Sequence, residues 1–176
     1  MTRGRAVCRM TSGQAAQVAG IWRRAWHSAN PQVRVADLAP GDHWLERVRS
    51  EFFGPAECWV LAGDALQGFV VIEPARAYLA QLHVDPDWQG QGAGRLLIEQ
   101  ACERMPAGWS LHVAESNQRA QQFYGAAGMQ RGESGHDPVT GRARVAWHWM
   151  PAAARAALLP LHTCPVPDTT GIAPAC

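Results

Sequence analysis

The apolar and polar positions divide the first 150 residues into short segments with two different periods. Apolar runs of five to seven residues, bounded by glycine, proline or aspartate, are typical of β-strands. These runs cover residues 6–10, 58–62, 67–72, 78–84, 109–113, 129–133 and 144–149. Gly63-Asp64 separates the second run from the third, and the turn-rich stretch 135–138 separates the last two. Both pairs are therefore predicted to form β-hairpins.

The segments between these runs have a helical period. Thr11-Ser12 is a cap residue pair ahead of a helix that carries Trp22 and Trp26 on one face and breaks at Asn30-Pro31. Three further helices are predicted at residues 42–53, 93–105 and 117–127. The order of elements is thus β-α-α-β-β-β-α-β-α-β-β, which indicates an α/β protein with a mixed sheet.

Length and composition restrict the class of protein. A chain of 176 residues suits one domain, here expected at residues 1–150, followed by an Ala/Pro-rich C-terminal tail at 151–176 that we expect to be loosely packed. The net charge of +1 argues against a general nucleic-acid or membrane surface. No apolar run reaches membrane-spanning length and no signal peptide is evident, so we expect a soluble, cytoplasmic protein.

Cysteine and lysine usage excludes several chemistries. The five cysteines are scattered without a CxxC pair, so neither a metal site nor a disulfide framework is expected. All sixteen basic residues are arginine. The absence of lysine excludes a lysine base, a Schiff base and a P-loop lysine.

Glycines at 90, 92 and 94 lie between a predicted strand and a predicted helix. Such a turn lets the backbone approach an anion, and the following helix N-terminus favours negative charge. The turn is not a dinucleotide fingerprint, because Arg95 stands where GxGxxG requires glycine. Glycines alone leave two interpretations open, a pyrophosphate site or a strand-to-helix turn without a ligand.

Two motifs together resemble those of the GNAT (GCN5-related N-acetyltransferase) superfamily. The first is Gln89-x-x-Gly92-x-Gly94 after a strand ending in L-x-V-x-P. The second is Asn117-x-x-Ala120-x-x-Phe123-Tyr124-x-x-x-Gly128-Met129, in which methionine replaces the usual phenylalanine. The resemblance covers roughly residues 6–150 and includes the order of elements.

The resemblance implies a GNAT fold, a mixed central β-sheet whose fourth and fifth strands splay apart and are flanked by helices. It also implies an N-acyltransferase that passes an acetyl group directly from acetyl-CoA to an amine acceptor, a small molecule or a peptide, in a ternary complex. Neither nucleic acid nor membrane is expected as a partner, and a homodimer is left open. Two alternatives remain, a protein or peptide N-terminal acetyltransferase and a non-catalytic acyl-CoA sensor.

The resemblance assigns cofactor-binding roles to two stretches of the chain. The fourth-strand backbone would pair with the pantetheine arm, the glycine turn would hold the pyrophosphate, and one face of the 117–127 helix would line the arm. The residues concerned are Leu82, His83, Val84, Gln89, Gly90, Gln91, Gly92, Ala93, Gly94, Arg95, Asn117, Ala120 and Tyr124. Asn117 would also be an ordinary helix N-cap.

Three residues are candidates for catalysis. Tyr124 resembles the family tyrosine that protonates the departing thiolate. His112 stands where relatives place a glutamate base, in the sequence L-H-V-x-x-x-N, and His83 occupies the adjacent fourth strand. Each histidine alone would be explained as a hydrogen-bonded core residue, and the pair leaves a catalytic role open.

By the same resemblance, the acceptor would contact the first two helices and the last hairpin. The predicted contacts in these regions are Trp26, His27 and His136, together with Trp22, Trp44, Glu133 and Trp147. Glu73, at the end of the third predicted strand, is a further predicted contact and, like Glu115, a weaker candidate for the base. Tryptophans at helical spacing are usually core residues, so the tryptophans have two interpretations.

Overall fold

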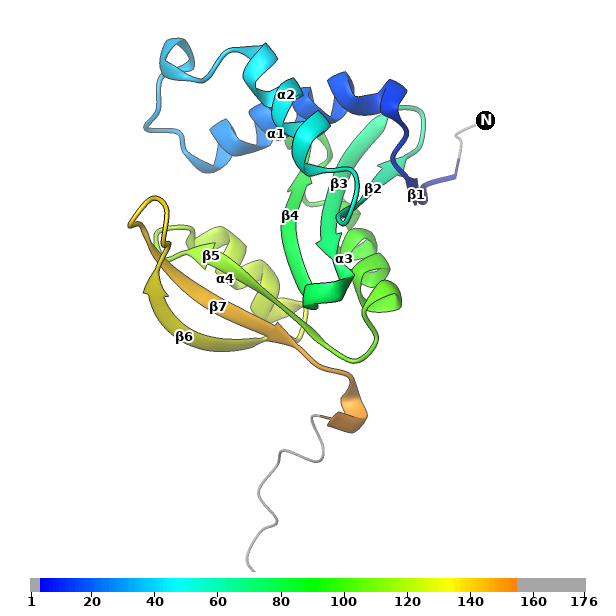
Figure 1. Cartoon of the computed structure of the whole chain (residues 1–176), viewed down its shortest axis with the longest axis vertical. Coiled ribbons are helices and arrows are strands. Elements are labelled where there is room, and N and C mark those ends of the chain that lie inside the picture. Colours follow the sequence, from blue (N-terminus) through cyan, green and yellow to red (C-terminus); the bar gives the residue numbers. More distant parts are fainter. Residues whose placement is uncertain (1–3, 155–176) are drawn as a thin grey trace, which may run out of the picture.

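The computed structural model describes residues 4–154. Of the predicted tail, only residues 151–154 fall within this range, with helical backbone at 152–154, and the rest lies outside the described residues. The strands of this part of the chain form one sheet in the order β1-β2-β3-β4-β5-β7-β6 (Figure 1). Their bounds are β1 Ala6–Arg9, β2 Glu57–Ala62, β3 Leu66–Glu73, β4 Tyr78–Val84, β5 Trp109–Ala114, β6 Gln130–His136 and β7 Ala143–Trp149.

The α-helices are α1 Ala15–Ala29, α2 Gly41–Glu51, α3 Ala93–Arg104 and α4 Gln118–Ala126. Short 3-10 turns occupy Ser12–Gln14, Val35–Asp37, Pro74–Arg76 and Pro86–Trp88. The predicted order of elements is confirmed. The first helix starts later than expected, because Thr11 opens the 3-10 turn instead, where its backbone N–H donates to Oε1 of Gln14 at 2.9 Å.

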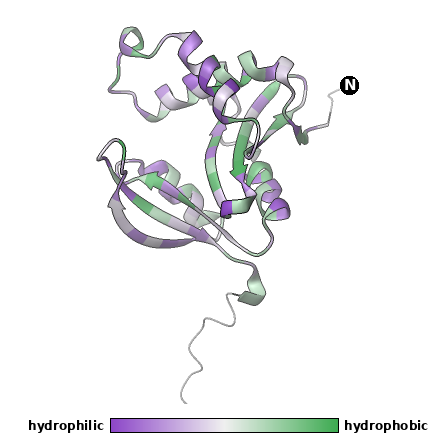
Figure 2. Ribbon diagram, viewed as in Figure 1, coloured by the Kyte–Doolittle hydropathy of each residue, from purple (hydrophilic) through white to green (hydrophobic). Residues whose placement is uncertain are grey.

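Two hydrophobic clusters lie on opposite faces of the sheet. On one face, α1 and α2 cover β2, β3 and β4 through residues such as Val18, Trp22, Val48 and Phe69. On the other face, α3 packs against the same strands, and its cluster continues without a break onto β5, β7 and α4. Hydrophobic residues therefore concentrate in the central strand β3, whereas the edge strand β6 is largely hydrophilic (Figure 2).

The helices α1 and α2 do not extend over β5, β7 and β6, so one face of these three strands is open. The burial pattern of β5 alternates, with Leu111 and Val113 buried against the α4 side and His112 exposed on the other face. The same alternation along β7 buries Val145 and Trp147. Because side chains alternate across a strand, Arg144, Ala146 and His148 share the open face with His112.

The central strands β4 and β5 are parallel but diverge after their first residues (Figure 1). Tyr78 faces Ser110, the one register pair between them in residues 4–154, and the Ser110 N–H donates to the Ala77 carbonyl at 3.0 Å. The register between β4 and β3 skips Ala80, which is a β-bulge in β4. A bulge bends its strand and increases the local twist. The splay predicted for the fourth and fifth strands is therefore present.

Candidate active site

The glycine turn between β4 and α3 has the properties of an anion site. Gly90 and Gly92 adopt left-handed backbone conformations, with φ of +76° and +80°, and an added Cβ at either position would meet nothing within 4 Å. Within residues 4–154, the five consecutive backbone amides of residues 90–94 donate no hydrogen bond. Unpaired amides at the start of a 12-residue helix suit a pyrophosphate. The turn thus fits the diphosphate of CoA.

Gly94 serves a different purpose from the other two glycines. A Cβ at this position would lie 3.0 Å from Cζ and 3.1 Å from Cε2 of Phe123 on α4. The glycine therefore permits close contact between the first turn of α3 and α4, and its contribution to an anion site is limited to its amide. Ala93 is also packed, at 1% exposure, in the cluster beneath the sheet.

The polar side chains of the turn mostly stabilise the turn itself. Gln89 donates from Nε2 to the Val84 carbonyl at 3.0 Å, and Gln91 donates to the Asp87 carbonyl at 3.0 Å. Arg95 pairs with Glu99 one helical turn further on, at 3.1 Å. Arg5, which the sequence did not single out, donates from Nη1 to the Gln91 carbonyl at 2.6 Å and lies over the Trp88 ring.

The edge of β4 toward β5 is free for an extended ligand. Beyond Tyr78, no residue of β4 pairs with β5 in the described part of the chain. The Asp85 N–H donates to the Gln67 carbonyl, so by alternation His83 directs its backbone groups to β3, whereas Leu82 and the N–H of Val84 face the gap. An extended chain can pair with such an edge as an added strand. The pantetheine arm of CoA is such a chain, and the edge fits it.

At the fork of the two strands, Tyr78 and His112 are in contact. The Tyr78 hydroxyl lies 3.2 Å from Nδ1 of His112, and the two ring centroids are 5.9 Å apart. Ala77 turns the chain into β4 just before Tyr78 and has a φ of +47°. No other non-glycine residue in the range 4–154 has a positive φ. A left-handed alanine costs about 1 kcal/mol, so the surrounding fold must hold this turn. Tyr78 lies in the strand predicted at residues 78–84 but is not among the predicted site residues.

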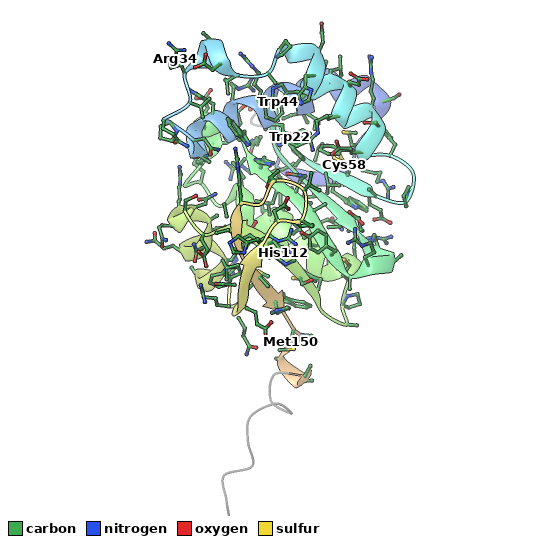
Figure 3. The ribbon with its side chains drawn as sticks, turned by 60° about the vertical axis from the view of Figure 1, so that its left-hand side comes forward. Trp22, Arg34, Trp44, Cys58, His112 and Met150 are labelled. Atoms are coloured by element: carbon green, nitrogen blue, oxygen red, sulfur yellow. The ribbon has the colours of Figure 1, made fainter. Side chains whose placement is uncertain are left out.

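The surroundings of His112 lower its pKa below the ordinary value for histidine. Loss of hydration next to the neighbouring side chains is the largest cause, followed by the positive charges of Arg144 and His148, and Asp137 opposes them. A histidine with a lowered pKa is neutral at neutral pH and can accept a proton. Burial raises the pKa of Tyr78, so its hydroxyl stays protonated and can donate to Nδ1. In Figure 3, His112 lies below Trp22 and Trp44 of the helical layer.

His83 lies apart from this pair. Its Nε2 is 3.0 Å from Oε1 of Gln81, and its ring packs against Phe69 and Trp22 at centroid distances of 5.4 and 6.0 Å. Burial lowers the pKa of His83 to about 4. No hydrogen bond or ring contact joins the two histidines in residues 4–154. Tyr78 and Ser110 face each other across the two strands. His83 is five residues beyond Tyr78, whereas His112 is two residues beyond Ser110, so the two histidines are offset by three residues, or ~10 Å, along diverging strands.

Tyr124 is buried on the α4 side of the fork, at 7% exposure. Its ring neighbours are Phe123 and Trp147, at centroid distances of 5.2 and 6.4 Å. Burial raises the pKa of Tyr124 well above its usual range, with a smaller contribution from nearby Tyr78, so the hydroxyl stays protonated at neutral pH. Asn117 caps α4, because its Oδ1 accepts from the Ala120 N–H at 3.0 Å.

The open face of β5, β7 and β6 contains a hollow of about 470 Å³. It is lined by His112, Gly132, Glu133, Ser134, Gly135, His136, Arg144, Ala146 and His148. Of the predicted acceptor contacts, His136 therefore shares a surface with His112. Arg144 and His148 were not selected from the sequence, although their alternation along residues 144–149 places them on one face.

The other predicted acceptor contacts make local interactions. Trp26 packs on Trp44 at 6.1 Å between centroids, and Nε2 of His27 is 3.0 Å from the Val33 carbonyl oxygen. Glu73 pairs at 2.8 Å with Arg76, whose guanidinium lies over the Tyr78 ring. Trp22, Trp44 and Trp147 have exposures of 2 to 6% and belong to the core, so the core interpretation holds for these three.

Comparison with known proteins defines the class. Residues 16–129 match the model of the Acetyltransferase (GNAT) family. Peptidyl-lysine N-acetyltransferase YjaB of Salmonella typhimurium is 32% identical over 127 residues, which cover 71% of this chain and 77% of that protein. The YjaB protein of Escherichia coli is 32% identical over 103 residues, or 57% of this chain and 63% of that protein.

Solved structures share the fold. The solution structure of apo YjaB from Escherichia coli has a TM-score of 0.67 at 22% identity and covers 85% of this chain and 99% of that one. The PaiA N-acetyltransferase of Thermoplasma acidophilum, solved with coenzyme A, has a TM-score of 0.65 at 15% identity, with coverages of 81% and 98%. The chain belongs to the GNAT acetyltransferase family. It is an N-acetyltransferase that uses acetyl-CoA and acts on an amine acceptor.

None of the described helices is both long and apolar enough to cross a membrane. No group of histidine, cysteine, aspartate or glutamate side chains suited to a metal ion occurs among residues 4–154.

Proposed function

We propose that the enzyme transfers the acetyl group directly from acetyl-CoA to a primary amine, with the Tyr78–His112 pair as the proton acceptor and Tyr124 as the proton donor. The observation that carries this proposal is the 3.2 Å contact between the Tyr78 hydroxyl and Nδ1 of His112 at the fork of β4 and β5. The fork is where the free edge of β4 would bring the thioester, and His112 also lines the open hollow.

Deprotonation of the amine is the first step of the proposal. An amine arrives at neutral pH mostly as an ammonium ion and must lose a proton before its lone pair can attack. The proton passes to the Tyr78 oxygen as the Tyr78 proton passes to Nδ1 of His112. The imidazole is neutral before this step because its pKa is lowered, and it becomes an imidazolium ion afterwards.

Attack and departure complete the transfer. The amine nitrogen bonds to the thioester carbonyl carbon, and a backbone N–H at the β4 bulge stabilises the negative charge that develops on the carbonyl oxygen. The carbon–sulfur bond then breaks, and the thiolate takes a proton from the Tyr124 hydroxyl. Because the pKa of Tyr124 is raised, the tyrosinate that remains is reprotonated readily.

The acceptor is proposed to be a lysine side chain of a peptide or a small primary amine. The name of the Salmonella relative, a peptidyl-lysine N-acetyltransferase, supports the first choice. The open face of the C-terminal strands supports both, because neither α1 nor α2 covers it. The N-terminal amine of a peptide would use the same proton acceptor and remains the alternative.

Release of CoA thiol tests the proposal with a panel of lysine peptides, peptides with free N-termini, amino acids and polyamines. We expect acetyl-CoA to raise the melting temperature, and at least one amine to support turnover. Tyr124→Phe is expected to lower kcat about a hundredfold while the Kd for acetyl-CoA changes little. Binding without turnover of any amine would favour the acyl-CoA sensor instead.

A further inference from the structure

Small residues line the bottom of the hollow on the open face. In the register of β5 and β7, His112 faces Ala146, whose methyl group leaves space above the strand. Gly132 of β6 makes room for the His148 ring beside Ala146, since a Cβ there would lie 2.5 Å from Nε2 of His148 and 3.3 Å from Cβ of Ala146. The hollow of about 470 Å³ is therefore set by the residue types of two neighbouring strands. A substrate can lie beside His112 without displacing a large side chain.

Polar side chains of β7 stand on either side of His112. Arg144 faces Ala114 and His148 faces Ser110, so each is one diagonal step from His112 across the strand pair. Diagonal neighbours on one face of an antiparallel pair are separated by ~7–8 Å. This spacing lets one small molecule contact His112 and Arg144 at the same time.

Arg144 is held in place at one of its nitrogens. Its Nη1 donates to Oδ2 of Asp137 at 2.9 Å. Asp137 is itself fixed at the tip of the β6–β7 hairpin, because its Oδ1 accepts from the N–H groups of Val139 and Thr140 at 3.1 and 2.8 Å. Asp137 thus anchors the guanidinium through a carboxylate that belongs to the turn.

The opposite edge of the Arg144 guanidinium is free. Within residues 4–154, neither its Nε nor its Nη2 makes a hydrogen bond, and the side chain is 27% exposed in the lining of the hollow. The Nε–Nη2 edge of arginine matches the two oxygens of a carboxylate. Among the residues that line the hollow, Arg144 is the one that carries a permanent positive charge. The other ionisable residues of the lining are Glu133 and three histidines, His112, His136 and His148.

We propose that Arg144 is a specificity-determining residue that binds a carboxylate of the acceptor close to the amine that is acetylated. The proposal rests on the proposed function, because it takes the amine to be deprotonated at His112. The carboxylate has two chemical sources, the α-carboxylate of a free amino acid and an acidic side chain next to a lysine in a peptide. Polyamines, which lack a carboxylate, are poor acceptors under this proposal.

Two matched pairs of acceptors test the proposal in turnover. One pair is glycine and glycinamide, and the other is a blocked tetrapeptide in which a single lysine precedes either glutamate or glutamine. We expect the carboxylate member of at least one pair to have a kcat/KM about tenfold higher, mainly through KM. The pair that responds identifies the source of the carboxylate.

Variants assign the preference to Arg144. Arg144→Gln is expected to abolish the preference for the carboxylate member, and Arg144→Lys, which keeps the charge but not the planar fork, to restore part of it. Arg142→Gln removes the same charge from the same hairpin at a residue outside the lining of the hollow, and it should leave the preference intact. Comparing the ratio within each pair between wild type and variant cancels the different basicities of the two amines.

The affinity of the enzyme for acetylated products tests carboxylate binding by Arg144 independently of the proposed catalytic function. Titration of the enzyme–CoA complex with N-acetylglycine, N-acetylglycinamide and the two acetylated peptides requires no turnover. A carboxylate-dependent affinity that Arg144→Gln removes supports the proposal, even if no amine in the panel is acetylated. Equal ratios for wild type and Arg144→Gln, in turnover or in binding when turnover is absent, would overturn it.

Discussion

The Tyr78 hydroxyl on β4 and Nδ1 of His112 on β5 lie 3.2 Å apart at the point where the two strands are still paired. Beyond this point the strands diverge, so the pair stands at the mouth of the gap. A few residues on either strand fix this geometry: the left-handed Ala77 ahead of Tyr78, and the Ser110 N–H that donates to the Ala77 carbonyl.

Removal of the Tyr78 hydroxyl should impair the chemical step. Tyr78→Phe keeps the ring but breaks the contact with His112, so we expect kcat to fall about tenfold to a hundredfold with little change in the Kd for acetyl-CoA. His112→Gln should give a similar loss, and the double variant should be little worse than either, because the two groups act as one acceptor. Steady-state kinetics with melting temperatures as a control measure this, and additive losses would mean that the residues act separately.

The pH dependence of kcat/KM should report the lowered pKa of His112. The unprotonated imidazole is the active form, so activity should be at its plateau near neutrality and fall as the pH drops through the pKa of His112. Arg144→Gln removes a positive charge that lowers this pKa, so the acid limb should move to higher pH. An acid limb at the same pH in wild type, Arg144→Gln and His112→Gln would assign it to another group.

The contact between Gly94 and Phe123 should make position 94 intolerant of a side chain. In Gly94→Ala the new Cβ would begin 3.0 Å from the Phe123 ring, and we expect the free energy of unfolding to fall by about 1–3 kcal/mol. Gly41→Ala is a matched control, since a Cβ there meets nothing within 4 Å. Chemical denaturation measures both variants. Phe123→Leu should make Gly94→Ala less costly, and a full loss in that background would show that the ring is not the cause.

The partly buried imidazole of His83 should make stability depend on pH. Its folded-state pKa of about 4 is below the unfolded value, so the unfolded state binds more protons between these two values and stability falls as the pH drops from about 6.5 toward 4. From pH 7.5 to pH 5 this loss is about 2 kcal/mol by linkage. His83→Gln should flatten this part of the curve in denaturation experiments. An unchanged slope in the variant would mean that His83 is already accessible to protons.

Much of the fold could be predicted from local patterns. Strand and helix periods fix the order of elements because each face of a strand or helix must meet either core or solvent. The two motifs added the splay of β4 and β5, which periodicity cannot predict because it depends on how two distant strands approach each other. The helix α1 begins later than predicted because the interaction between Thr11 and Gln14 favours a 3-10 turn ahead of the helix.

The candidate site was only partly predictable. The glycine turn, Asn117, Tyr124 and His112 were selected because each belongs to a motif whose residues lie close together along the chain. Tyr78 and Arg144 depend on cross-strand register, and no local pattern indicates that residues 34 and 32 positions away from His112 lie beside it. For the same reason, the placement of His83 on the strand next to that of His112 did not reveal that the two side chains have separate partners.

The sequence by itself determined the class of this protein, because the glycines at 90, 92 and 94 and the motif from Asn117 to Met129 are both encoded locally along the chain. It also determined which strand faces are apolar, and hence that His112 would be opposite Leu111 and Val113. Only the tertiary structure decided which side chains surround His112. The register of β5 against β7, the bulge at Ala80 and the divergence of β4 from β5 are set by packing between segments far apart in the chain. These contacts select Tyr78 and Arg144, and leave His83 partly buried against Trp22 of α1 and Phe69 of β3.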